Sequence, residues 1–278
     1  MKNNKNVPKK APQKTESAEV PESTQKRSGI SFRKVSRTVA LVIAILIFGN
    51  IAFFSTVVVL ANTRHIAASR AEYESLRELA SDLEADSGRY DESHSGTFDE
   101  EMRQINPDYV GWIRIGGTNI DYPVVRGGDN DRYINTSFYG EENIAGAIFM
   151  DYRNTGDLLE PLFGEALPHI IIYGHNLQQG GMFSDLRRFL NSDFFNENRT
   201  ITLFVNDRVI EFEIFSARLT DINDPAYFLD FYAPHSFPRF ADRVEAPLRA
   251  TQIVTLSTCV NGGSSNARLV VQGYRTLG

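Results

Sequence analysis

The chain contains a single cysteine, Cys259, in the segment "TLSTCV", which follows a run of β-forming residues and precedes the glycines of "NGGSSN". A lone cysteine cannot form a disulfide within its own chain, so its thiol either fills space in a core or takes part in chemistry. A reactive thiol acts as a thiolate, and histidine is its usual proton-transfer partner. The first question is therefore which histidine could lie beside it.

Two of the five histidines flank one apolar segment, "HIIIYGHN". His175 follows the point where this predicted strand ends and polar groups can gather, so we predict that it is the proton donor and acceptor. His169, at the other end, is expected at the surface. The remaining three histidines are predicted to lie outside the barrel or in an insert: His65, His94 and His235.

Attack on an amide creates an oxyanion that needs hydrogen-bond donors. Arg268 follows Cys259 by nine residues, across the glycine-containing loop. A hairpin that pairs the two flanking strands would bring the guanidinium back beside the thiol. The alternative, an arginine that is only solvated at a sheet edge, stays open on spacing alone.

Strand alternation predicts which way the cysteine faces. In "IVTLSTC", Val254 and Leu256 point to one side of the strand, whereas Thr255, Ser257 and Cys259 point to the other. The apolar pair belongs to the core. The thiol is therefore expected on the outer face, toward a groove, which weakens the packing interpretation.

From Phe98 onward, short apolar segments alternate with Gly, Asn, Asp and Pro, which is typical of a mostly β protein. Closure removes exposed strand edges, so we predict a closed barrel of seven or eight strands. Two helical inserts are predicted, an amphipathic one at 181–190 and a second at 224–246 that is broken at Pro234 and Pro238. The predicted strands are 110–115, 120–125, 147–150, 169–173, 200–205, 208–218, 253–258 and 268–274.

Residues 39–61 form an uncharged apolar run that suits a helix crossing about 30 Å of hydrocarbon. A cleaved signal peptide has a shorter apolar core, so we predict a transmembrane anchor. Residues 1–38 carry ten Lys or Arg against three Glu, a net of +7, and because the whole chain carries −6 the remainder carries −13. Positive charge is retained in the cytoplasm, which predicts a cytoplasmic N-terminus, a cell-membrane location and an extracellular remainder. So acidic an outer part argues against nucleic-acid binding.

These patterns divide the chain. Residues 1–38 are expected to be a disordered basic tail that only orients the anchor, and 62–97 a juxtamembrane helix, near 63–85, followed by a polar linker. The helix either packs on the domain or acts as a stalk. Residues 98–278 are expected to form the catalytic domain.

Several segments together resemble the sortases, membrane-anchored cysteine transpeptidases of Gram-positive bacteria. They are "NPDYVGWIRIGGTNIDYPVV", "DNDRYI", "GAIFMDYRN", "IIYGHN", "MFSDL", "TLSTC" and "ARLVVQG", and they cover roughly 102–274 in the family's order and spacing. The helical insert before the cysteine strand and the N-terminal anchor resemble class B. Class C enzymes, which polymerise pilins, commonly carry an N-terminal lid and a second membrane segment, and this chain is expected to have neither.

The resemblance implies a sortase-type barrel and specific roles. Cys259 would be the nucleophile, His175 the acid and base, and Arg268 the group that stabilises the oxyanion. It implies cleavage of an LPXTG- or NPQTN-like C-terminal sorting signal after Thr, and transfer of the secreted protein to an amine of a lipid II-type peptidoglycan precursor. No cofactor and no metal are expected. The substrate groove would be lined by Asn130, Ile134, Tyr173, Tyr227 and Ser257.

Three alternatives stay open at this stage. The chain could be a class C-like pilin polymerase, a purely hydrolytic cysteine protease, or a catalytically silent surface-binding domain on the same fold. Product analysis with different amines separates the first two from cell-wall anchoring, and a thiol-directed probe of Cys259 tests the third.

Overall fold

The computed structural model describes residues 37–87, 98–155, 167–206, 208–233, 235–260 and 265–276. The chain divides into two compact units, residues 1–55 and 56–278. In the first unit the described residues belong to helix α1 (Arg37–Ser87). Its segment Val39–Ala61 is long and apolar enough to cross a membrane, with a mean hydropathy of 2.5, and it matches the predicted apolar run residue for residue. The basic tail and the linker at 88–97 lie outside the described residues.

In the second unit α1 continues without a break as far as Ser87, so the predicted juxtamembrane helix is the C-terminal part of one long helix. Between Val57 and Ser87 the sequence has no Gly or Pro to interrupt the hydrogen-bond ladder. Tyr73, Leu76 and Ala80 follow one another at helical spacing and are buried in the core of the barrel unit. This part of the helix packs on the domain and is not a stalk.

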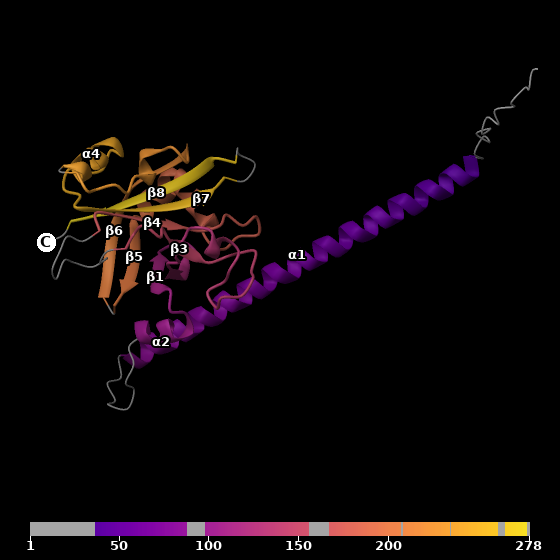
Figure 1. The fold of residues 1–278 in the computed structure, drawn as a ribbon, viewed down its shortest axis with the longest axis horizontal. Helices are drawn as coiled ribbons and strands as arrows, with labels where there is room; N and C mark the ends of the chain where they lie inside the picture. The colour runs from indigo at the N-terminus through magenta and orange to yellow at the C-terminus, as the bar shows by residue number, and fades with distance from the viewer. Residues whose placement is uncertain are drawn as a thin grey trace, which may run out of the picture. The chain divides into compact units, whose positions relative to one another are not determined.

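Eight strands close into a mixed barrel, which confirms the predicted fold class (Figure 1). Their order around the barrel is β1-β2-β3-β4-β7-β8-β6-β5. Most neighbours are antiparallel, but β2 pairs with β3 and β4 with β7 in parallel. The strands are β1 (Tyr109–Ile115), β2 (Asp121–Val125), β3 (Ile148–Met150), β4 (His169–Tyr173), β5 (Thr200–Val205), β6 (Arg208–Asp221), β7 (Gln252–Cys259) and β8 (Ala267–Arg275).

Alternate residues of the strands fill the barrel interior. On β7, Val254 and Leu256 lie in the main core with Ile172 of β4 and Val271 of β8, as alternation predicts. The outer face of β7 is also covered, because Thr255 and Ser257 are buried as well. Cys259, at the end of the strand, is exposed, as expected for a thiol on the outer face, whereas Ser257, predicted to line the groove, is covered.

The helical segments differ from the prediction in detail. The first insert is a 3-10 helix, η2 (Ser184–Leu190), with Leu186 and Phe189 buried. The second contains the 3-10 turn η3 (Pro225–Tyr227) and helix α4 (Ser236–Arg243). Pro238 lies in the first turn of α4, where its missing N–H removes no helical hydrogen bond, so it does not break the helix. Pro234 lies outside the described residues. Three short elements were not predicted: α2 (Phe98–Ile105), α3 (Ser192–Glu197) and the 3-10 helix η1 (Arg132–Ile134).

His169 is fully buried, which corrects the expectation of a surface position. Its Nδ1 lies 2.8 Å from Phe228 O in the β6–β7 insert, and its ring packs against Phe240 of α4 with ring centroids 4.4 Å apart. The insert therefore covers this end of β4. The strand pattern "HIIIY" gave no sign of this, because the covering residues lie about 60 positions further along the chain.

Candidate active site

Cys259 is the last residue of β7, and its cross-strand partner in the antiparallel pair with β8 is Arg268. Side chains of directly opposed residues lie on the same face of a sheet. The hairpin therefore puts the side chains of Cys259 and Arg268 on the same face of the sheet, which the spacing alone had left open. Arg268 Nη1 donates to Ser265 O and Ala267 O, both at 2.9 Å, so the base of the β7–β8 loop holds the guanidinium.

His175 lies just beyond the end of β4, which runs parallel to β7 with Tyr173 paired to Ser257. Two contacts extend this pairing past the strand end. Gly174 N donates to Ser257 O at 3.2 Å, and Thr258 Oγ1 donates to Gly174 O at 2.7 Å. Two residues beyond the Tyr173–Ser257 pair come His175 and Cys259, so the imidazole and the thiol emerge from neighbouring strands at the same barrel end.

The orientation of the imidazole is set by Ile134 O, which lies 2.7 Å from His175 Nε2. A carbonyl oxygen only accepts hydrogen bonds, so Nε2 carries a proton and Nδ1 is the nitrogen left to exchange one. Gly146 makes this arrangement possible. It has φ +59, and a Cβ on it would lie 2.5 Å from Ile134 O. Ile134, predicted to line the groove, thus acts here through its main chain.

Asn176, which follows His175, was not singled out from the sequence. Its Nδ2 donates to Cys259 O at 2.9 Å and so ties the loop after β4 to the end of β7. The only sequence signal was its place in "YGHN".

Ser257 and Tyr227 form one contact, 2.7 Å between Ser257 Oγ and the Tyr227 hydroxyl. Ser257 is 2% exposed, so Tyr227 covers it and the serine does not face an open groove. Burial raises the pKa of the Tyr227 hydroxyl, its hydrogen bond with Ser257 and the positive charge of Arg268 oppose this, and a thiolate at Cys259 would add to it. Tyr227 therefore lies within electrostatic reach of both residues.

Beneath this contact a buried hydrogen-bonded chain holds the insert to the barrel. His169 Nε2 lies 2.8 Å from Thr255 Oγ1, which also accepts from Gln272 Nε2 at 2.9 Å. Burial lowers the pKa of His169 to about 4, which keeps the ring neutral at ordinary pH. In the neutral ring Nδ1 donates to Phe228 O, so Nε2 accepts from the threonine hydroxyl.

Asn130 and Tyr173 meet at Asp151, a carboxylate that sequence reasoning missed. Asn130 Nδ2 and the Tyr173 hydroxyl donate to Asp151 Oδ2 at 3.1 and 2.9 Å. Burial alone would raise the pKa of Asp151, but the side-chain and backbone hydrogen bonds and the charge of Arg153, together with the Tyr173 hydroxyl, outweigh it and lower the pKa. The acid therefore stays ionised and fixes both predicted groove residues. A polar "DYRN" directly after the buried strand β3 was the available signal.

Within the described ranges, no three acid, histidine or cysteine side chains gather as metal ligands. The chemistry of the site is carried by a thiol, an imidazole and a guanidinium at the ends of β7, β4 and β8. A nucleophile, a proton carrier and an oxyanion donor are the groups that acyl transfer through a cysteine requires. The arrangement thus defines the class of cysteine acyltransferases.

Comparison with known proteins narrows the class. Residues 113–276 match the family model of the sortase domain. Sortase B of Listeria monocytogenes is 34% identical over 185 residues, which are 62% of this chain and 72% of the relative. Sortase B of Staphylococcus aureus is 30% identical over 181 residues, 62% of this chain and 71% of the relative.

A solved structure described as a Staphylococcus aureus sortase B–substrate complex has a TM-score of 0.62 and 29% identity, and covers 74% of this chain and 94% of that one. The chain belongs to the sortase family, and its relatives are of class B. It is therefore a cysteine transpeptidase, which sets aside the catalytically silent alternative.

Proposed function

We propose that this transpeptidase cleaves a C-terminal sorting signal of secreted proteins after Thr, through a thioester on Cys259, and transfers them to a peptidoglycan amine. The observation that carries the proposal is the strand register. Cys259 is paired with Arg268 between β7 and β8, and Ser257 is paired with Tyr173 between β7 and β4. His175 follows Tyr173 by two residues, as Cys259 follows Ser257. The LPXTG- or NPQTN-like signal is what the resemblance of the sequence to the family implies, and the similarity to class B sortases, one of them solved with a substrate, supports a peptide substrate of this kind.

In the acylation step, the Cys259 thiolate attacks the Thr carbonyl carbon and the amide C–N bond breaks. His175 gives its Nδ1 proton to the leaving amine, while Ile134 O keeps the ring oriented through Nε2. Arg268 donates to the oxyanion of the tetrahedral intermediate. In the second step an acceptor amine attacks the thioester, its proton passes to His175, and the C–S bond breaks to release the thiolate.

The proposed substrate groove follows the line of polar contacts around the thiol. Tyr173 and Asn130 would form one wall, since Asp151 fixes both. Tyr227, held by the buried Ser257 beneath it, would form the other, on the side of the β6–β7 insert. Ile134 would lie near the histidine. A groove partly covered by the insert also limits water, which favours transfer to an amine over hydrolysis.

The anchor and its orientation complete the proposal. Residues 39–61 would span the membrane, with the basic residues 1–38 in the cytoplasm and the domain of residues 98–278 outside the cell. Residues 62–97 would connect the two. A lipid II-type precursor, held in the same membrane, is the acceptor that this location makes available.

The full chain in detergent, incubated with fluorogenic LPXTG and NPQTN peptides, tests the proposal. We expect cleavage, a thioester intermediate on Cys259 by mass spectrometry, and amide products when a glycine-based amine is added. Cys259→Ala should lose cleavage completely while its thermal unfolding stays the same. Wild-type cleavage rates in Cys259→Ala would overturn the assignment, and products unaffected by amines would indicate a hydrolase. A pilin-derived lysine peptide preferred over cell-wall amines would indicate a polymerase.

A further inference from the structure

The C-terminal part of helix α1 contacts the two segments that hold His175 in place. Residues 56–87 of the helix belong to the same compact unit as the barrel. One face of this part meets the domain, because Ser69, Tyr73 and Leu76 are buried and follow one another at helical spacing. Leu76 contributes packing, whereas the two hydroxyl side chains reach segments on which the histidine depends.

The first of these segments is the loop of residues 143–147, just before β3. The Tyr73 hydroxyl donates to Gly146 O at 2.7 Å, and this contact is buried. Ser69 Oγ donates to Asn143 Oδ1 at the beginning of the same loop. The helix therefore holds the 143–147 loop at two points.

The 143–147 loop in turn fixes the carbonyl of Ile134. Two main-chain N–H groups of the loop donate, at 3.0 and 2.9 Å, to the carbonyls of the residues just before and just after Ile134. Gly146 backs directly onto the carbonyl between them, since a Cβ there would lie 2.5 Å from Ile134 O. That carbonyl is the one that lies 2.7 Å from His175 Nε2. Helix α1 thus supports the partner of the imidazole through one intervening loop.

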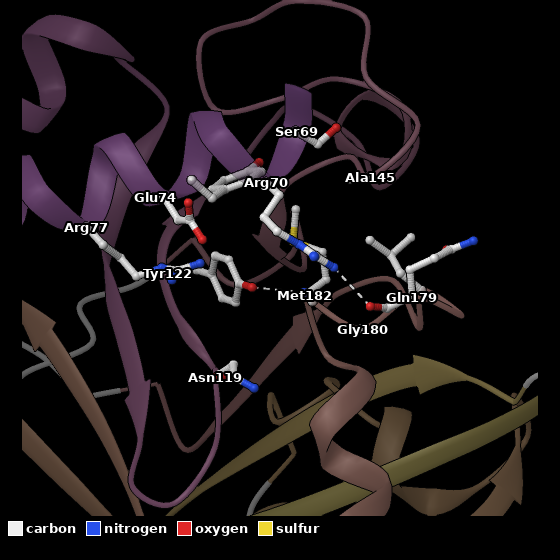
Figure 2. Close-up of a pocket in the computed structure, with 13 residues that line it drawn as sticks. Ser69, Arg70, Glu74, Arg77, Asn119, Tyr122, Ala145, Gln179, Gly180 and Met182 are labelled. Atoms are coloured by element: carbon white, nitrogen blue, oxygen red, sulfur yellow. Dashed lines mark hydrogen bonds between the residues drawn. The ribbon is translucent and has the colours of Figure 1, made fainter. Parts of the chain in front are cut away.

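The second segment is the loop that follows His175. Its end returns to the histidine, because Phe183 N donates to His175 O at 2.9 Å. One residue earlier, Met182 N donates to the Tyr122 hydroxyl at 3.1 Å (Figure 2). The Tyr122 ring meets Tyr73 edge-on, with ring centroids 5.4 Å apart. Tyr73 therefore contacts both supports of the histidine, one with its hydroxyl and the other with its ring.

These supports decide which imidazole nitrogen can exchange a proton. A neutral imidazole carries its proton on either nitrogen, and the hydrogen bond made by one nitrogen selects the tautomer. A fixed Ile134 O selects the form protonated on Nε2, which leaves Nδ1 for proton transfer. If this carbonyl moves, the other tautomer becomes populated, and only a fraction of the molecules can catalyse the reaction.

We propose that Tyr73, assisted by Ser69, is a positioning residue for acyl transfer: through the 143–147 loop and Ile134 O it keeps His175 protonated on Nε2. This inference rests on the proposed role of His175 in the transpeptidase reaction. Tyr73 acts through other residues and takes no part in proton transfer itself.

The test uses the full chain in detergent, labelled with ¹⁵N-histidine, and compares the wild type with Tyr73→Phe and with Ser69→Ala/Tyr73→Phe. Phenylalanine keeps the buried ring and removes only the donor to Gly146 O. At a pH where the ring is neutral, the ¹⁵N shifts of His175, assigned with His175→Gln, should show one Nε2–H tautomer in the wild type. They should show a mixture in Tyr73→Phe and more of the second tautomer in the double variant.

Cleavage of the sorting peptide provides the second readout. In the double variant kcat should fall about tenfold, because a displaced proton carrier is no longer aligned with the reacting atoms. KM should stay within about twofold of the wild-type value, since the proposed groove residues are unchanged.

Two control variants separate positioning from stability. Leu76→Ala leaves a cavity on the same helix face and keeps both hydroxyl contacts, so it should lower the unfolding temperature at least as much as the double variant. Its tautomer and kcat should stay at wild-type values. Tyr232→Phe removes the same hydroxyl at an exposed position and should change neither.

Either a single Nε2–H tautomer or a wild-type kcat in the double variant would overturn the inference. So would equal losses of kcat in Leu76→Ala and in the double variant, since the helix would then act through stability alone. If the wild type cleaves no sorting peptide, the proposed function fails, whereas the tautomer comparison still tests whether Tyr73 positions His175.

Discussion

The Tyr227 hydroxyl lies 2.7 Å from Ser257 Oγ and joins the β6–β7 insert to the strand that ends in the nucleophile. Tyr227 also lies within electrostatic reach of Cys259 and Arg268. The contact therefore joins the proposed groove wall to the two catalytic residues at the ends of β7 and β8.

Removing either partner of this contact should weaken peptide binding. A hydrogen bond of this kind contributes about 1 kcal/mol, so Tyr227→Phe and Ser257→Ala should each raise KM for the sorting peptide by about fivefold. Because both changes remove the same bond, the double variant should resemble either single variant. Steady-state kinetics on the four proteins gives the coupling, and strictly multiplicative effects would contradict a shared contact.

Replacing Arg268 by lysine should lower kcat strongly, although the positive charge is kept. The guanidinium is held at Ser265 O and Ala267 O by Nη1 and presents a planar set of further donors, whereas an ammonium is a point charge. Loss of an oxyanion donor lowers kcat by about 100-fold or more. Arg239→Lys is the matched control, and near-normal kcat/KM in Arg268→Lys would argue that the arginine has no role in the transition state.

Asp151→Asn tests the carboxylate that holds the other groove wall. The side chain is fully buried and accepts from Arg153, Tyr173 and Asn130. The change weakens the hydrogen bonds that the buried carboxylate accepts, whereas Arg153 is 44% exposed and can be hydrated, so the free energy of unfolding should fall by about 1 to 2 kcal/mol. Urea denaturation measures this change. Asp230→Asn, at an exposed position, should have almost no effect, and equal stability of the two variants would contradict the structural role.

His169 should make stability depend on pH in a defined window. Burial lowers its pKa from 6.5 to about 4, so between these values the unfolded chain binds a proton that the folded chain does not. The free energy of unfolding therefore falls as pH decreases from 6.5 to 4, by about 3 kcal/mol from this group. In His169→Gln the free energy of unfolding should lack this fall between pH 6.5 and 4, whereas His235→Asn, at an exposed site, should still show it. Denaturation at half-unit pH steps checks both, and parallel pH profiles of wild type and His169→Gln would contradict the buried neutral ring.

Local sequence patterns predicted much of the fold. The segment "IIIY" and the alternation in "IVTLSTC" predicted β4 and β7, because strand periodicity is a property of a few consecutive residues. Short 3-10 and helical elements such as α2 were missed, since six to eight residues give little periodic signal. The apolar helix at 39–61 was predicted from length and hydropathy alone.

For the site, motif spacing was enough to indicate the residue types that could do the chemistry: one thiol, a histidine at a strand end and an arginine across a loop. How these groups are held depends on contacts that no local pattern reports. Ile134 O orients His175, Asp151 fixes Asn130 and Tyr173, and the insert buries His169, all through partners distant along the chain. Helix α1 likewise gains its place against the barrel from contacts some 70 to 110 residues apart in sequence. Periodicity and motif spacing report on neighbours along the chain, whereas these contacts form only when the barrel closes and brings separate segments together.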